Sequence, residues 1–130
     1  MSKYGFSVQI DGGFDAAIEK VTVELQNEGF GILTEIDVQA TMKKKLNIDQ
    51  RPYRILGACN PPLAHQAISA DPDIGLLLPC NVVVRQEEDG GITVVFMDPS
   101  AVLKLVDKPG VDELASTVRE KLMRVCDALK

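Results

Sequence analysis

Residues 81–97 read NVVVRQEEDGGITVVFM, which is two apolar runs on either side of a polar turn. The runs 81–86 and 92–97 are rich in valine, isoleucine and phenylalanine, residues that favour strands. The turn contains Asp-Gly-Gly at 89–91, the kind of sequence that closes a β-hairpin. The stretch therefore predicts two neighbouring antiparallel strands. It favours an α+β domain, two layers with a mostly antiparallel sheet packed by helices, over a doubly wound parallel sheet.

Hydrophobic periodicity extends this prediction to the rest of the chain. Apolar residues repeat every three or four positions after Gly13 and again after Gly110, which is typical of amphipathic helices. Residues 4–10 alternate between apolar and polar side chains instead, as a half-buried strand does. We expect helices over 14–28, 61–69 and 110–129, shorter helices over 38–46 and 99–105, and strands over 4–10, 31–36, 53–59, 74–78, 81–86 and 92–97.

The composition is that of an ordinary globular chain. It has 130 residues, of which 45% are hydrophobic and 25% charged, so we expect one domain over residues 1–130. Fourteen basic and nineteen acidic side chains leave a net charge of -5. This balance argues against nucleic acid or an anionic membrane as a partner.

Sequence features also predict the cellular compartment of the protein. The longest apolar run, 74–84, is interrupted by Pro79 and Asn81 and is far shorter than the ~20 residues of a membrane-spanning helix. We recognise no signal peptide at the start of the chain. Three cysteines without regular spacing do not indicate a disulfide framework. We therefore expect a cytoplasmic protein with reduced thiols.

The chain lacks the common motifs of catalysis, namely a phosphate loop, a Cys-x-x-Cys pair and a nucleophile elbow. What stands out is a repeated dipeptide, Cys59-Asn60 and Cys80-Asn81, each next to a proline and at a strand end or bend. We expect the two dipeptides to lie close together at one end of the sheet. The N-terminus of the helix over 61–69 would then offer free N–H groups and a partial positive charge, suited to a thiolate or a small anion.

Four segments in fixed order make the sequence familiar: GILTEID at 31–37, YRILGACNPP at 53–62, IGLLLPCNVVV at 74–84 and MDP at 97–99. Together they closely resemble the domain of unknown function 302 family, over essentially the whole chain. The resemblance implies a small α+β domain with an antiparallel-rich sheet, commonly found as a dimer. It implies no activity, because the family is uncharacterised. The positions that match its motifs are Glu35, Cys59, Asn60, Pro61, Pro79, Cys80, Asn81 and Asp98, and His65 is not among them.

The chemistry of Cys59 and Cys80 stays open at this stage. Both can be buried small side chains, or they can form a reactive thiol or reversible disulfide with Arg54 supplying a positive setting. With His65, the only histidine, they are also weak candidate ligands for zinc, although no fourth protein ligand is evident.

Asn60 is interpreted as a helix cap and Asn81 as a partner for backbone groups near a bend. Glu35 shares the strand parity of Leu33, so we expect it to point at least partly inward, where a carboxylate must be paired or shift its pKa. It is either in an ion pair with a lysine or arginine or a functional carboxylate. The candidate ligand-binding residues are Glu35, Cys59, Asn60, Cys80, Asn81 and Asp98.

Two functions from different classes fit these residues. The first is a non-catalytic homodimeric domain that binds a small molecule, an anion or a partner. The second is a thiol- or metal-dependent redox or catalytic protein centred on Cys59 and Cys80. The homodimer is expected because Val82-Val83-Val84 is apolar on both faces and 74–78 is apolar throughout, more than one helix layer covers. The alternative is a monomer, either with three layers or with its strands fully covered by the long C-terminal helix. The sequence identifies no cofactor.

Overall fold

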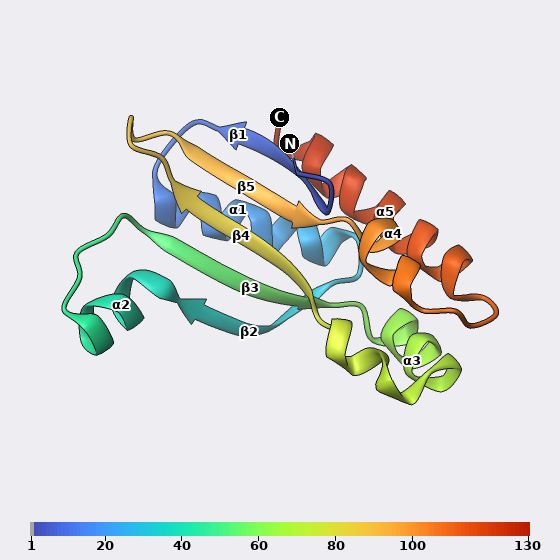
Figure 1. The fold of residues 1–130 in the computed structure, drawn as a ribbon. Helices are drawn as coiled ribbons and strands as arrows, with labels where there is room; N and C mark the ends of the chain where they lie inside the picture. The colour runs from blue at the N-terminus through green and yellow to red at the C-terminus, as the bar shows by residue number, and fades with distance from the viewer. Residues whose placement is uncertain (1) are drawn as a thin grey trace.

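The computed structural model describes residues 2–130 (Figure 1). The strands are β1 (Gly5–Ile10), β2 (Gly31–Asp37), β3 (Tyr53–Cys59), β4 (Cys80–Gln86) and β5 (Ile92–Met97). The helices are α1 (Phe14–Asn27), α2 (Val38–Leu46), α3 (Pro61–Ala70), α4 (Pro99–Val102) and α5 (Val111–Ala128), with two 3₁₀-helices, η1 (Pro72–Leu77) and η2 (Leu103–Leu105). All strand pairs are antiparallel, in the order β1–β5–β4–β3–β2. The expected α+β fold is confirmed.

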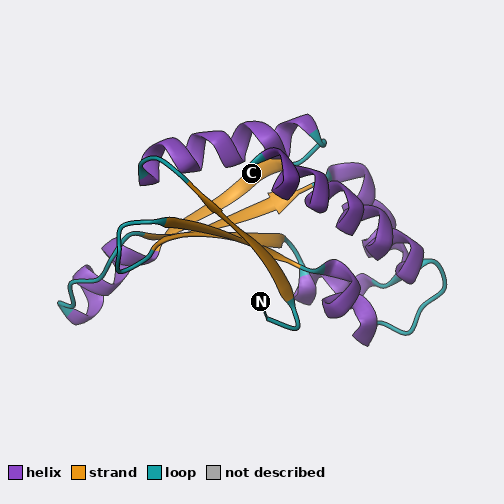
Figure 2. Cartoon of the chain, turned by 90° about the horizontal axis from the view of Figure 1, so that it is seen from above, coloured by secondary structure: helices purple, strands orange, loops and turns teal. Residues whose placement is uncertain are grey.

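The hairpin at 81–97 forms the centre of the sheet. Val82 pairs with Phe96 and Val84 with Val94, and all four side chains are fully buried on one face. Figure 2 shows that α1 and α5 lie on this face. The alternation of the strands therefore places one set of side chains under the two long helices, as a two-layer arrangement requires.

The strand expected over 74–78 is wrong, because residues 74–77 belong to η1 and Leu78 follows it as the C-cap. The Asp71 side chain caps η1 by accepting a hydrogen bond from the Asp73 amide at 3.0 Å, and Pro72 fits the first turn. The helical turn places Ile74 and Leu77 in the same apolar cluster and leaves Leu76 88% exposed. A short apolar run fits either a buried strand or a helical turn, and the local cap selects the turn.

The core has two apolar clusters that share α5. The larger lies between the sheet, α1 and the C-terminal part of α5. The smaller lies between α3, η1, η2 and the first turns of α5. Leu63 on α3 packs against both clusters. None of the helices within residues 2–130 combines the length and the apolar character needed to cross a lipid bilayer.

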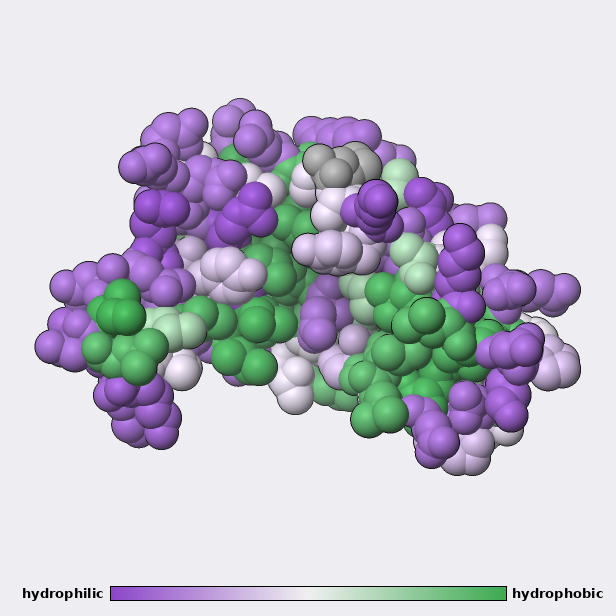
Figure 3. Space-filling view, in the orientation of Figure 1, coloured by the Kyte–Doolittle hydropathy of each residue, from purple (hydrophilic) through white to green (hydrophobic). Residues whose placement is uncertain are grey.

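The opposite face of the sheet, which we call the open face, faces the viewer in Figure 1, and no helix within residues 2–130 lies over it. Strand register places Ile36, Ile55, Val83 and Val95 side by side across four strands on this face. All four side chains are partly exposed. In the same view, Figure 3 shows apolar residues in the middle of the open face and at both ends. Val82-Val83-Val84 is thus apolar on both faces, but helices cover only one.

Candidate functional site

A pocket lies at the end of the sheet where β3 ends and β4 begins, and we call it the sheet-end pocket. Its volume is about 310 Å³, at the small end of the range for small-molecule sites. Residues from β2, β3, β4, α3, η1, η2 and α5 line it. Apart from Thr34, Asn60 and two thiols, every lining residue is apolar: Phe30, Leu33, Ala58, Leu63, Ala64, Ala67, Ile68, Gly75, Leu78, Pro79, Leu103, Leu114 and Val118.

Small side chains leave room for this pocket. On α3, Ala64, Ala67 and Ile68 follow the i, i+3, i+4 spacing that puts them on one helix face, and all three line the pocket. Gly75 on η1 lines another wall, again with no bulky side chain. Larger residues at these positions would fill the space between α3, η1 and the sheet end.

Cys59 and Cys80 both line the sheet-end pocket. Ala58 pairs with Cys80 across β3 and β4, so Cys59 is one residue from the direct partner of Cys80. Cys80 is buried, and burial raises the pKa of its thiol to about 11, with a smaller contribution from Cys59. The Cys80 thiol is therefore neutral near pH 7, a soft apolar part of the wall and a poor nucleophile. Both cysteines are free.

Asn60 is at the N-cap position of α3 but does not cap it with its side chain. Its Nδ2 instead donates a hydrogen bond to the Glu28 carbonyl at 3.4 Å, 32 residues back in the chain. Gly29 next to it has φ +86, and a side chain there would approach Nδ2 to 3.0 Å. The interpretation of Asn60 as a helix cap is thus correct for its position only. The side chain joins the end of α1 to the start of α3 and sets one wall of the pocket.

The first turn of α3 has few amide donors. Pro61 and Pro62 occupy its first two positions and have no N–H, and the Ala64 amide already donates to the Asn60 carbonyl at 2.8 Å. The expected anion-binding end is therefore reduced to the Leu63 amide. An apolar pocket with so few donors is a poor anion site.

Glu35 lies away from the sheet-end pocket. It pairs with Leu56 and shares the helix side of the sheet, but its side chain is 45% exposed because β2 is an edge strand. Glu35 therefore points to the helix side of the sheet, as expected, but its side chain is not buried. Its carboxylate accepts a hydrogen bond from Arg54 at 2.6 Å, and this bond is the main reason that the pKa of Arg54 is raised. Arg54 also lies 5.7 Å from the centre of the Phe14 ring.

The remaining candidates have other surroundings. Asn81 pairs with Gly57 and is exposed on the open face. Asp98 caps α4 by accepting a hydrogen bond from the Ser100 amide at 3.0 Å, and it pairs with Arg119 at 3.2 Å. His65 is exposed on α3 and does not line the pocket. Within residues 2–130, no three histidine, cysteine or acidic side chains come together as a metal site.

Residues 6–129 match the profile of the family described as Domain of unknown function DUF302. The chain belongs to this family. It is also similar to a solved structure described as "Crystal structure of uncharacterized conserved protein DUF302 from Bacillus stearothermophilus", with a TM-score of 0.90 and 27% sequence identity. The match covers 99% of this chain and 100% of that chain. No curated protein matches. The resemblance seen in the sequence is confirmed.

Sequence reasoning missed most of the pocket of this DUF302 domain. Phe30, Leu63, Leu114 and Val118 line it, yet in the sequence they are ordinary core positions. One signal was present: the alanines at 64 and 67, beside Ile68, leave little side-chain volume on the inner face of α3. Small residues facing a core either bring two elements close together or leave a space, and only the packing decides between these outcomes.

Proposed function

We propose that this DUF302 domain is a non-catalytic binding domain that holds one small, largely apolar molecule in the sheet-end pocket and works as a homodimer. The observation that carries the proposal is the pocket itself. It is about 310 Å³ in volume, its wall is mostly apolar and drawn from seven helices and strands, and it includes three of the six candidate residues, Cys59, Asn60 and Cys80.

The lining limits the chemistry of the ligand. Among the described residues 2–130, no acidic or basic side chain contributes to the wall. A charged ligand would therefore lose its hydration without gaining an ionic partner. Thr34 and Asn60 supply hydroxyl and amide groups that suit one hydroxyl, carbonyl or amide group on the ligand. The pocket therefore fits a compact apolar molecule with a single uncharged polar group.

Titration with N-phenyl-1-naphthylamine, a neutral apolar fluorophore, tests the pocket. Wild-type protein should bind it saturably. Ala64→Phe places a ring in the pocket and should weaken binding at least about tenfold, the equivalent of roughly 1.4 kcal/mol. His65→Phe puts the same ring on the exposed side of the same helix and should leave binding unchanged. Equal binding by the two variants, both folded by circular dichroism, would show that the pocket is not the site.

The open face supports the homodimer. It carries a row of partly exposed apolar side chains across four strands, and a two-fold partner would bury that row against its own copy. Sedimentation equilibrium at micromolar concentrations should give a mass near twice 14.1 kDa. A single 14.1 kDa species at every concentration would exclude the dimer.

A thiol-dependent function is the second candidate, and the observation in its favour is that Cys59 and Cys80 share one pocket. The raised pKa of Cys80 works against it, because the neutral thiol reacts slowly. Thiol titration of native protein, with metal analysis of the same sample, separates the two candidates. Rapid modification of Cys80 or a stoichiometric metal would favour the thiol-dependent function.

A further inference from the structure

Exposed apolar side chains gather at the two ends of the open face. At one end, none of the residues of α2 is buried, and Leu46 and Ile48 are 61% and 47% exposed. At the other end, Leu33 and Ile68 line the sheet-end pocket while being 67% and 47% exposed, so they form its rim. Leu76, 88% exposed, lies next to the lining residue Gly75. Figures 1 and 3 show α2 and the α3–η1 region at opposite ends of this face.

We infer that the two ends cover each other in the homodimer: α2 of one copy lies over the pocket rim of the partner and completes its sheet-end pocket. This inference rests on the proposed function, since it assumes both the pocket and the dimer. The occupant of the rim is a second copy of this chain. The pocket is then closed only in the dimer.

The geometry follows from the position of the two-fold axis. When two sheets face each other, an axis that runs across the strands exchanges the two ends of each sheet, whereas an axis along the strands keeps like ends together. The row of Ile36, Ile55, Val83 and Val95 runs across the strands, so the first axis stacks each of these side chains on its own copy. The same axis brings α2 to the partner's α3 and η1.

Charge favours this axis. Lys43, Lys44 and Lys45 lie in the last turn of α2, and Asp71 and Asp73 lie at the start of η1 beside the pocket. With the axis across the strands, the lysines of one copy lie next to the aspartates of its partner. With the axis along the strands, the lysines of both copies would lie together and repel each other.

The required area points the same way. Five strands about 4.8 Å apart and roughly 20 Å long present only about 500 Å², whereas a stable dimer buries roughly 800 Å² on each partner. The open face alone is too small. Contacts from α2 and from the pocket rim supply the remainder, and they supply apolar surface that is otherwise exposed.

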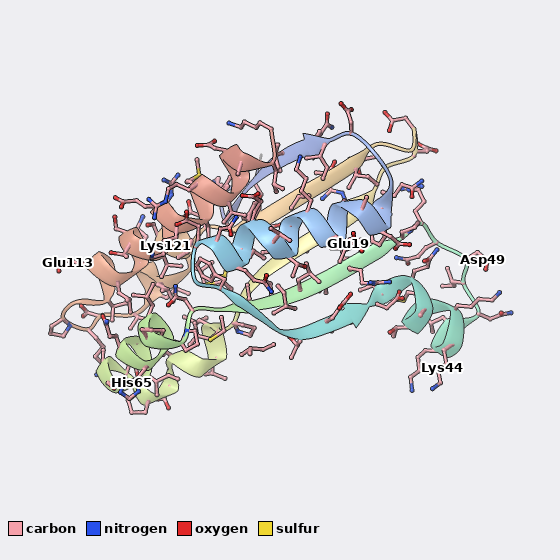
Figure 4. The ribbon with its side chains drawn as sticks, turned by 180° about the vertical axis from the view of Figure 1, so that it is seen from behind. Glu19, Lys44, Asp49, His65, Glu113 and Lys121 are labelled. Carbon is pink, nitrogen blue, oxygen red and sulfur yellow. The ribbon has the colours of Figure 1, made fainter. Side chains whose placement is uncertain are left out.

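Cysteine cross-linking tests the arrangement. Leu46→Cys and Leu76→Cys variants are prepared separately, mixed in equal amounts and oxidised with oxidised glutathione. Figure 4 shows Lys44 of α2 and His65 of α3 at opposite ends of the molecule, and η1, which carries Leu76, packs against α3. Leu46 and Leu76 of one copy are therefore far apart. A covalent link between them is therefore intermolecular. We expect the mixture to give covalent dimers that peptide mapping identifies as joined through residues 46 and 76. Neither variant alone should give a 46–46 or a 76–76 link; mapping also sets aside links that involve the native Cys59, which lines the pocket.

A binding measurement adds an independent readout. Leu46→Asp changes no residue of the pocket in its own chain, yet it should weaken N-phenyl-1-naphthylamine binding roughly tenfold by removing the partner's apolar cover. Val23→Asp is the matched control, because Val23 is 52% exposed on α1, on the other side of the sheet. It should leave binding unchanged.

The outcomes separate this inference from the proposed function. A 46–46 link in the Leu46→Cys variant alone would show α2 against α2 and overturn the inference while keeping the dimer. The inference also fails if the mixture gives no link although the wild-type protein is dimeric and binds the fluorophore. A monomeric wild-type protein, or one that does not bind the fluorophore, overturns the proposed function instead.

Discussion

Crowding around Gly57, on the open face, makes this position sensitive to any added side chain. A Cβ built there would collide with the Thr34 side chain and would lie 2.9 Å from Cγ of Pro79. We predict that Gly57→Ala destabilises the fold by about 1–3 kcal/mol, the usual cost of overpacking. Urea unfolding measures the loss.

Gly31, also a strand glycine, is the control for this prediction. Nothing lies within 4 Å of a Cβ at this position. Gly31→Ala should therefore leave stability unchanged or slightly higher, because alanine reduces the freedom of the unfolded chain. If the two variants lost equal stability, the crowding at Gly57 would not be the cause.

The Cys80 thiol predicts a pH dependence of stability. Its pKa is about 11 in the folded protein, against 9.0 for an ordinary thiol, because burial disfavours the thiolate. Below pH 9 the thiol is protonated in both states, so its full contribution is present. As the pH rises from 9 to 11 the unfolded chain releases this proton first, and roughly 2–3 kcal/mol of stability is lost.

The measurement compares wild-type protein with Cys80→Ala by urea unfolding between pH 8 and pH 11. Other groups titrate in both proteins, so the difference between the two free energies of unfolding at each pH reports the contribution of Cys80. That difference should shrink as the pH rises. Parallel curves would show that the thiol is not shielded as the structure implies.

At the scale of the element, Asp98 combines a cap and an ion pair. Its carboxylate accepts the Ser100 amide hydrogen bond at the start of α4 and pairs with Arg119 of α5. We predict that Asp98→Ala costs about 1–2 kcal/mol in urea unfolding. Asp98→Asn retains a capping oxygen and loses only a partly exposed ion pair, so it should cost less than about 1 kcal/mol. An equal loss in both variants would assign the effect to the ion pair alone.

The elements also show where sequence patterns stop being decisive. Long periodic segments such as the last helix were predictable, since a stripe of apolar residues over five turns fits no other structure. Residues 74–78 were not, because five apolar residues fit a strand as well as a turn of helix. The side chain of Asp71, three residues before Ile74, determines the outcome through its bond to the Asp73 amide.

For the whole molecule, substitutions at two neighbouring valines test folding and dimerisation separately. Val82 is fully buried under the helices, whereas Val83 lies in the apolar row of the open face. We predict that Val83→Lys gives a folded monomer of 14.1 kDa in sedimentation, with an unchanged circular dichroism spectrum. Val82→Lys should lose the fold, because it buries an unpaired charge. A dimeric Val83→Lys protein would show that the open face is not the interface.

The sequence by itself determined the class of fold and most of its elements, because strand alternation, helix periodicity, caps and turns are local properties of neighbouring residues. It also singled out Cys59, Asn60 and Cys80, whose positions at strand ends follow from the order of the elements. Only the tertiary structure decided that these residues share an apolar pocket, that Glu35 pairs with Arg54 at the partly exposed edge of the sheet, and that no helix within residues 2–130 covers the open face. The physical reason is distance along the chain: the pocket is a space left between β3, α3, η1 and α5, and a space between distant segments has no signature in any one of them.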